Sequence, residues 1–224
     1  MRATRISPCV LVLSLAAVSR AFAETADSRK LAPPPDQPRD RALAALLTRL
    51  RNIVSKRDAA ALLSLMGPTF RVGFDAGKGP AAFRSLWQPE LESSEIWPLL
   101  ARLLALRGTF YSPTLFCIPY VYTKFPVDLD PLSHVVVVRD QAAVRRSPDD
   151  SSAIIANLSY DIVRTAHSLA VPVRLEREAW VAVITSADES GFVPAQDVYS
   201  PAEYRVFFEK QKGAWRWLSL ACAD

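Results

Sequence analysis

The sequence has few of the residues that carry most enzyme chemistry. It contains only two histidines, His134 and His167, with three cysteines and seven glycines among its 224 residues. No G-x-S-x-G, H-E-x-x-H or C-x-x-C pattern occurs, so the common serine-hydrolase, zinc-peptidase and dithiol motifs are absent. The segment GFDAGKG contains Gly77-Lys78, but its glycines are too closely spaced for a phosphate-binding loop and Gly79 stands where Ser or Thr is needed. We therefore expect no enzyme activity, no metal site and no cofactor.

Proline, with 17 residues, is much more frequent than glycine in this chain. Turns must therefore rely on Pro, Asp and Ser, because few positions have the conformational freedom of glycine. Half of the residues are hydrophobic and 22% are charged, which is a balance typical of a globular protein. The length fits one large domain or two small ones.

The first 23 residues have the pattern of a secretory signal peptide. Two arginines precede an apolar run of about a dozen residues, and small residues at Ala21 and Ala23 follow. This pattern predicts cleavage between Ala23 and Glu24. The run is shorter than the roughly 20 residues that a membrane span needs, so we expect a periplasmic or secreted protein that does not span a membrane after cleavage.

Removal of the signal peptide changes the charge of the protein. Arg2, Arg5 and Arg20 leave with it and no acidic residue does, so the formal charge falls from +4 to +1. A nearly neutral protein lacks the excess positive charge that is typical of nucleic-acid binding. We expect no nucleic-acid partner.

Residues 24–40 are rich in proline and predict an extended linker. An α-rich domain is expected over 41–130. Asp40 begins a helix with an apolar stripe at Leu43, Leu46, Leu47 and Leu50.

Three further helices are predicted in this domain. Asp58 is an N-cap candidate for the second, which Gly67-Pro68 would end. The third carries Phe83, Leu86 and Trp87, and the fourth covers 93–107, with a serine as its cap. Residues 109–126 are extended and aromatic but interrupted by proline, so they are expected to form edge strands or irregular structure.

The two cysteines that remain after export are Cys117 and Cys222. An oxidising compartment permits a disulfide between them, which would close a loop of about 100 residues. Two separately buried thiols are the alternative, because free cysteine is a common core residue.

Short β-branched runs separated by Ser, Asp and Pro turns fill the segment from His134 to Ser200. Ala143-Val144-Arg145-Arg146-Ser147-Pro148, the Ser159-Tyr160-Asp161 turn and Gly191-Phe192-Val193 stand in the order found in bacterial SH3-like (SH3b) domains. The segment resembles that family, which implies a small β-barrel over 131–199 and an overall α+β fold.

The resemblance also implies a binding module without chemistry of its own. The family binds peptides or cell-wall peptidoglycan, so the expected partner is peptidoglycan or an envelope protein. The ligand-binding candidates are the aromatic and acidic residues of the loops, although packing of the barrel is the preferred interpretation of Trp180. These candidates are Tyr160, Trp180, Asp149, Asp150, Asp188 and Glu189.

Residues 200–224 predict a β-hairpin with a turn at 211–213. A two-stranded hairpin is marginal alone, so it must extend the barrel or return to the N-terminal helices. In the second arrangement the chain distantly resembles the cone-shaped α+β fold of nuclear transport factor-like proteins.

Two functions follow as hypotheses. The first is an exported, non-enzymatic binding protein that uses the barrel to bind peptidoglycan or a peptide or protein partner in the envelope. The alternative is an envelope enzyme or accessory with a small-molecule pocket in a transport factor-like N-terminal domain, lined by residues such as Phe70, Phe74, Trp87 and Trp97.

Overall fold

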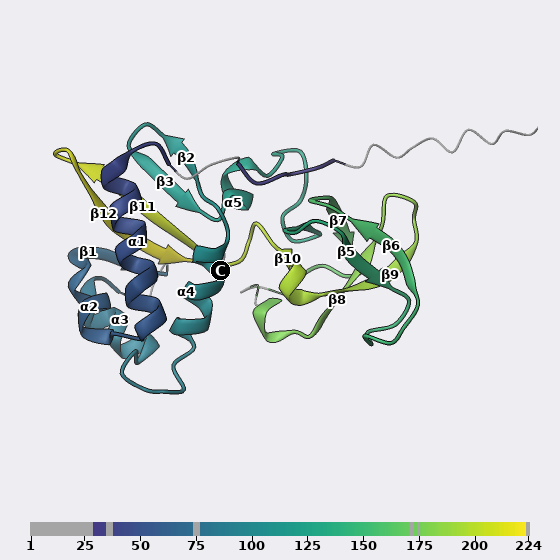
Figure 1. Ribbon diagram of the computed structural model, residues 1–224, viewed down its shortest axis with the longest axis horizontal. Coiled ribbons are helices and arrows are strands. Elements are labelled where there is room, and N and C mark those ends of the chain that lie inside the picture. The colour runs from purple at the N-terminus through teal and green to yellow at the C-terminus, as the bar shows by residue number, and fades with distance from the viewer. Residues whose placement is uncertain (1–28, 35–37, 74–76, 171–172, 174, 223–224) are drawn as a thin grey trace, which may run out of the picture.

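The computed structural model shows an α+β protein built from two units, each with its own β-sheet (Figure 1). It describes residues 29–34, 38–73, 77–170, 173 and 175–222. The predicted signal peptide and its cleavage site lie outside the described residues. Among the residues described, no helix is long and apolar enough to cross a membrane.

The first unit contains the helices. Asp40 caps the longest one as predicted, because its carboxylate accepts hydrogen bonds from the backbone N–H groups of Ala42 and Leu43 at 3.0 and 3.1 Å. Asp58 caps the next helix in the same way. The helices are α1 (Arg41–Lys56), α2 (Ala59–Ser64), α3 (Gly79–Trp87), α4 (Ile96–Ala105) and α5 (Tyr120–Lys124).

Two helix boundaries differ from the prediction. The second helix stops before Gly67-Pro68, which instead belong to a strand. Ser94 does not cap α4, because its hydroxyl donates to the backbone carbonyl of Trp87 at 2.5 Å. In both places a tertiary contact or strand pairing outweighs the local signal.

The first sheet is five-stranded, and its order is β1-β12-β11-β3-β2. Strands β1 and β12 pair in parallel and the other neighbours pair antiparallel. The C-terminal hairpin β11–β12 thus returns to the N-terminal helices, which decides the question that the sequence left open. The strands are β1 (Met66–Val72), β2 (Thr109–Ser112), β3 (Leu115–Ile118), β11 (Arg205–Gln211) and β12 (Ala214–Ala221).

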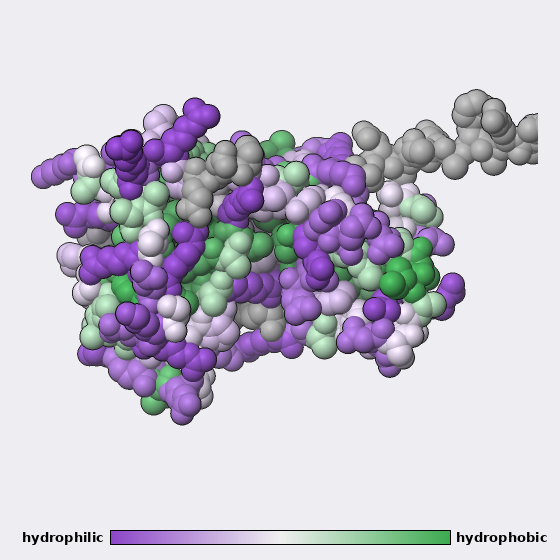
Figure 2. Space-filling view, viewed as in Figure 1, coloured by the Kyte–Doolittle hydropathy of each residue, from purple (hydrophilic) through white to green (hydrophobic). Residues whose placement is uncertain are grey.

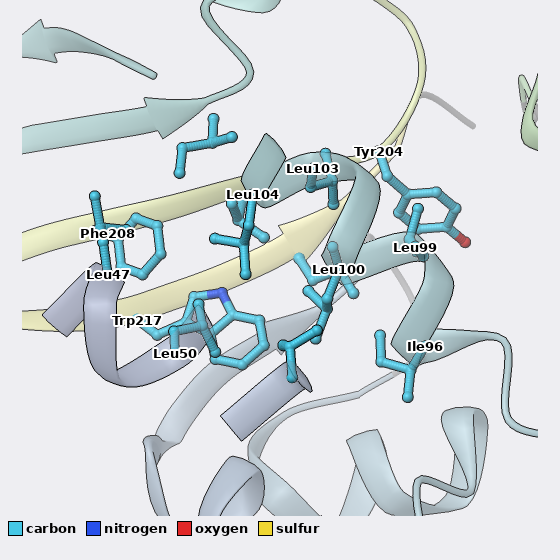
Figure 3. Packing of buried hydrophobic residues seen from close by; sticks show 14 of the residues in the cluster. Leu47, Leu50, Ile96, Leu99, Leu100, Leu103, Leu104, Tyr204, Phe208 and Trp217 are labelled. Atoms are coloured by element: carbon cyan, nitrogen blue, oxygen red, sulfur yellow. The ribbon is translucent and has the colours of Figure 1, made fainter. Parts of the chain in front are cut away.

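The core of this unit lies between the sheet and the helices. Leucines of α1 and α4 pack against Phe208 and Trp217 of the hairpin (Figure 3). Phe70 contacts both Phe83 and Trp217 edge to face, with ring centroids 5.8 and 5.0 Å apart. Aromatic rings therefore fill the space beneath the helices.

The second unit is a seven-stranded antiparallel sheet with the order β10-β4-β7-β8-β9-β5-β6. Valines from the strands form a second core on one of its faces. The strands are β4 (His134–Val137), β5 (Ala142–Arg145), β6 (Ile154–Leu158), β7 (Ile162–Thr165), β8 (Trp180–Ile184), β9 (Ser190–Pro194) and β10 (Val198–Tyr199). The short helices η1 (Leu175–Arg177) and η2 (Ala195–Asp197) complete it.

The strands lie where the sequence predicts them, but the predicted closed barrel is wrong. Strands β10 and β6 end the sheet on opposite sides, and no pairing joins these two strands within the described residues. Alternating hydrophobicity locates a strand, but it does not specify which edges pair, because that depends on contacts distant in sequence.

The two units are joined tightly. Val136 of β4 and Tyr199 of β10 belong to the core of the first unit. The connection after β10 is buried and hydrogen-bonded: the Tyr199 hydroxyl donates to the Tyr204 carbonyl, and the Glu203 carboxylate accepts from the Ser200 N–H at 2.9 Å. The two units therefore pack directly against each other and are not joined only by a flexible linker.

Part of the predicted linker is ordered against both units. Residues 29–34 are extended, as expected, and Leu31 donates its N–H to the Tyr160 carbonyl at 2.7 Å. The Tyr120 hydroxyl donates to the Leu31 carbonyl at 3.0 Å. The chain before α1 thus bridges the second sheet and α5.

Both cysteines are buried and no disulfide joins them in this structure, so the predicted bond between Cys117 and Cys222 is not formed. Cys117 lies in β3 and Cys222 directly follows β12. Strand β11 lies between these two strands, because Phe207 pairs with both Cys117 and Ser219. Two steps across a sheet are roughly 9.6 Å, beyond the roughly 6.8 Å limit of a disulfide's Cα–Cα distance.

Candidate functional site

A cleft of about 650 Å³ lies where the two units meet. Helices α3 and α4 provide one wall, and the segment around η1, β8 and η2 provides the other. Hydrophilic side chains cover much of the visible surface of both units (Figure 2). The cleft is within the range of volumes that small-molecule sites occupy, roughly 300–1,000 Å³.

Two tryptophans line the cleft, one from each unit. Trp180 begins β8, where Val181 and Val183 face the second core, so alternation turns Trp180 away from that core. Trp180 therefore does not pack in the interior of the second unit, which differs from the packing role that the sequence favoured. Trp87 ends α3 and is 8% exposed, held edge to face against Tyr204 at 5.5 Å.

The indole nitrogen of Trp87 is an unusual feature of this wall. It is buried and has no hydrogen-bond partner among the described residues. A buried donor without an acceptor is unfavourable by about 1–3 kcal/mol.

The charges in the cleft have unequal roles. The Glu95 carboxylate of α4 and the Arg177 guanidinium of η1 form an ion pair of 2.6 Å that links the two walls. Arg102 is occupied in holding the units together. Glu178 and Asp150 add two more carboxylates to the lining, so the cleft has an acidic bias.

Arg102 fixes the geometry of the cleft. Its guanidinium donates to the backbone carbonyls of Ala195 and Val198 at 3.2 and 2.8 Å, which ties α4 to the second unit. It lies 5.1 Å from the centre of the Tyr199 ring and 3.8 Å from the buried Glu203 carboxylate. The cleft is therefore held open by buried contacts rather than by loops.

The structure brings together two of the residues that the sequence singled out. Trp180 and Asp150 both line the cleft. Asp149 beside them turns back on its own loop, because its carboxylate accepts from the Ser151 N–H and hydroxyl at 2.7 Å. Those hydrogen bonds lower the pKa of Asp149.

The other candidates lie elsewhere. Tyr160 has a left-handed backbone, φ 60°, and its carbonyl holds residue 31 of the N-terminal segment. Asp188 and Glu189 lie in the β8–β9 turn, where Asp188 forms an exposed ion pair with Arg164 at 3.6 Å. The six predicted residues therefore do not form one site.

Sequence reasoning missed most of the cleft. Arg102 stands in a helix whose apolar stripe indicated only packing, and Trp87 was expected to line a different pocket, inside the N-terminal domain. Trp180 carried a signal of its own, since an exposed aromatic on a strand is notable. The rest of the lining depends on how the two units pack.

The described residues contain no cluster of His, Cys, Asp or Glu suited to a metal ion. Asp128 pairs with Arg29, and Asp130 accepts from the Leu132 N–H at 2.9 Å. The Ser133 hydroxyl and this N–H lower the pKa of Asp130, as expected for a turn. These two carboxylates serve local structure.

Comparison with known proteins identified structures but no sequence relative. No family model and no curated protein matches the chain. An NTF-2 like protein of unknown function from Shewanella oneidensis is similar over 82% of this chain and 98% of its own, with 8% identity and a TM-score of 0.30. A protein of unknown function from Mycobacterium tuberculosis covers 81% of this chain and 69% of its own, with 13% identity and a TM-score of 0.27.

A third similar structure is a putative calcium/calmodulin dependent protein kinase II association domain from Xanthomonas campestris. It covers 87% of this chain and 94% of its own, with 11% identity and a TM-score of 0.25. The second sheet ends at β10 and β6 and no pairing joins these two strands within the described residues, so it is not the closed barrel that the SH3-like resemblance implies. The resemblance to bacterial SH3-like domains is therefore wrong.

Proposed function

We propose that this is an exported, non-enzymatic accessory protein that binds a small organic molecule in the cleft between its two units. The observation that carries the proposal is the pair of tryptophans, Trp87 and Trp180, on opposite walls of that cleft. Export itself rests on the signal-peptide pattern of residues 1–23. The first unit, with helices on one sheet and a returning hairpin, is assigned to the cone-shaped transport factor-like class.

The chemistry of the lining selects a class of ligand. Indole faces favour flat rings and cations. The carboxylates of Glu178 and Asp150 oppose a negatively charged ligand. A neutral or cationic molecule with a flat ring fits these demands.

The site differs in place from the pocket that the sequence placed inside the N-terminal domain. Phe70 and Trp97 are packed in the core, at 1% and 2% exposure, and Phe74 lies outside the described residues. Only Trp87 of that set lines the cleft. Wall binding was inferred from the SH3-like resemblance alone and is not part of this proposal.

Ligand-observed NMR with the mature protein tests the proposal. The library would contain aromatic amines, neutral aromatic alcohols and aromatic carboxylates of matched size. We expect amines and alcohols to bind in preference to carboxylates, and Trp180→Ala to weaken binding about tenfold through loss of the ring contact. Tyr111→Ala is the matched control, because Tyr111 is 63% exposed and does not line the cleft.

Two results would count against the proposal. The first is a library without a single binder, and the second is equal loss of binding in Trp180→Ala and Tyr111→Ala. Turnover of any bound compound would overturn the non-enzymatic part and favour the envelope-enzyme alternative.

A further inference from the structure

A second hollow, of about 460 Å³, lies on the first sheet away from the cleft. Paired residues on neighbouring strands share a face, and Arg71, Ser219 and Phe207 form one such row across β1, β12 and β11. Their neighbours Phe70, Leu220 and Phe208 belong to the core beneath the helices. The hollow therefore opens on the outer face of the sheet. We call it the basic hollow and define it by Arg71, Lys78, Tyr122, Arg205, Phe207 and Ser219.

Three cationic side chains meet in the basic hollow: Arg71, Lys78 and Arg205. None of the described residues that line it is Asp or Glu. Arg71 and Lys78 pair directly across a short antiparallel bridge, which places two like charges side by side. Like charges on directly opposed residues are unfavourable, so an anion between them would stabilise this arrangement.

Arg205 gives the second and independent observation. It is 8% exposed, and the hydrogen bond recorded for its side chain is a long one, 3.4 Å, to the Glu203 carbonyl. Its Nε is buried without a partner, and none of the ion pairs recorded among the described residues involves Arg205. A buried charge without a counterion is costly, because the protein interior replaces little of its hydration.

The rest of the hollow shows how an anion would be received. The Tyr122 ring of α5 lies 4.5 Å from the Arg205 guanidinium carbon and edge to face with Phe207 at 5.6 Å. This cation–π contact holds the guanidinium beside the hollow, and a guanidinium can bind a phosphate or carboxylate group with two parallel N–H···O hydrogen bonds. The Ser219 hydroxyl adds a polar group, and the rings add an apolar wall.

We propose that the basic hollow binds the phosphomonoester group of a small organic molecule. A phosphomonoester carries roughly −1.5 to −2 charges at pH 7, which matches several converging cations better than one carboxylate does. The volume exceeds that of a phosphate group, and the Tyr122 and Phe207 rings suit an attached apolar part. The group could belong to a soluble ester or to a lipid headgroup.

Isothermal titration calorimetry of the mature protein with phenyl phosphate, and with inorganic phosphate, tests the site. Sedimentation with vesicles containing phosphatidic acid, against phosphatidylcholine alone, tests the lipid source. We expect phenyl phosphate to bind more tightly than inorganic phosphate, with affinity that falls as sodium chloride is raised. Binding to vesicles without binding to phenyl phosphate would assign the site to a lipid headgroup.

The variants identify the residues. Arg205→Met keeps an apolar stem of similar length in the buried position and should weaken binding about tenfold or more. The double variant Arg71→Gln/Lys78→Gln changes only exposed side chains, so it remains informative if Arg205→Met does not fold. Arg164→Gln, on β7 of the other sheet, is the control and should bind as the unaltered protein does.

The proposal would be overturned if neither phosphate probe nor the phosphatidic acid vesicles bind. It would also be overturned if binding is unchanged in both Arg205→Met and Arg71→Gln/Lys78→Gln. The test is separate from that of the cleft, because Trp180→Ala should not alter phosphate binding.

Discussion

The cleft and the basic hollow differ in how they are built and in the charge they present. The cleft lies between two units and carries Glu95, Glu178 and Asp150 against two arginines. The hollow lies on one sheet, and its charged residues among those described are all cationic. Tryptophan lines the first, whereas Tyr122 and Phe207 line the second.

This difference shows that a nearly neutral chain can hold two sites that favour ligands of opposite charge. The net charge of the expected mature protein, +1, describes neither region. Local electrostatics depends on which charges the fold gathers and which it pairs. The following four experiments, three with substitutions and one with a thiol reagent, test how far the two regions and the fold around them are independent.

The largest effect is expected from Arg102→Met. The change removes two hydrogen bonds to the second unit and the cation that lies 3.8 Å from the buried Glu203 carboxylate. We expect a loss of about 3 kcal/mol in the free energy of unfolding, measured by urea denaturation. Cleft binding should weaken with it, while phosphate binding by the hollow persists.

The control for this change is Arg84→Met. Arg84 pairs with Glu90 at 2.6 Å on the surface, where both side chains are exposed. Its removal should change stability by less than about 1 kcal/mol. Equal losses in the two variants would show that Arg102 is not the tie between the units.

A moderate, pH-dependent effect is expected from Lys210→Met. The Lys210 ammonium lies 2.8 Å from the Asp40 carboxylate and holds the pKa of that carboxyl well below its usual range. A carboxyl whose pKa is depressed in the folded state contributes stability above its unfolded pKa, about 3.9, and loses it as pH falls through the folded value. The melting temperature of Lys210→Met should therefore be lower at pH 7, and the difference should shrink below about pH 4.

Asp40→Asn sharpens this experiment, because asparagine also caps helices well. It removes the charge while it keeps the cap of α1. The loss of stability in the double variant Asp40→Asn/Lys210→Met should not exceed the sum of the losses in the two single variants. A difference in melting temperature between the unaltered protein and Lys210→Met that grows as the pH falls would contradict the assignment of the ion pair.

A small effect on stability is expected from Glu95→Gln. Both members of the Glu95–Arg177 pair are exposed, so the loss should be about 0.5 kcal/mol. The selectivity of the cleft should change more, because a carboxylate leaves its lining. In competition NMR the disfavoured aromatic carboxylates should gain relative to the amines. Unchanged selectivity would indicate that Glu95 does not face the ligand.

The smallest response is expected from the cysteines of the folded protein. Burial raises the pKa of Cys117 to about 12, although Arg205 nearby acts in the opposite direction. Its thiolate population at pH 8 is therefore very low, and a thiol reagent should react negligibly before unfolding. Two thiols should react after denaturation without reductant. A rapid reaction of the folded protein would show that the reagent reaches Cys117 through the hollow. If no thiol reacts after denaturation without reductant, the disulfide between Cys117 and Cys222 forms after all.

Local signals predicted much of the secondary structure. Asp40 and the leucines after it define α1, because a cap and a 3.6-residue stripe act within a few turns. The strands around Val135, Val144 and Val193 lie where alternating hydrophobicity places them. Prediction was wrong where the result depended on partners distant in sequence, as in the missing closure between β6 and β10 and the end of α2.

The candidate sites depended still more on tertiary structure. The glycine spacing of GFDAGKG argued against a phosphate-binding loop, yet Lys78 lines the basic hollow together with Arg205, more than a hundred residues later. No local pattern marks a hollow whose residues come from β1, α5, β11 and β12.

The sequence by itself determined most of the helical and extended segments, though not the helix α5 within the segment expected to be extended, together with the expectation of export and the absence of the common catalytic motifs. Tertiary structure alone decided that the hairpin joins the first sheet, that Trp87 and Trp180 line one cleft, and that the two cysteines stay apart. The physical reason is the range of the interactions. Caps, stripes and alternation act over a few residues, whereas strand order, burial and the gathering of charges depend on the packing of the whole chain.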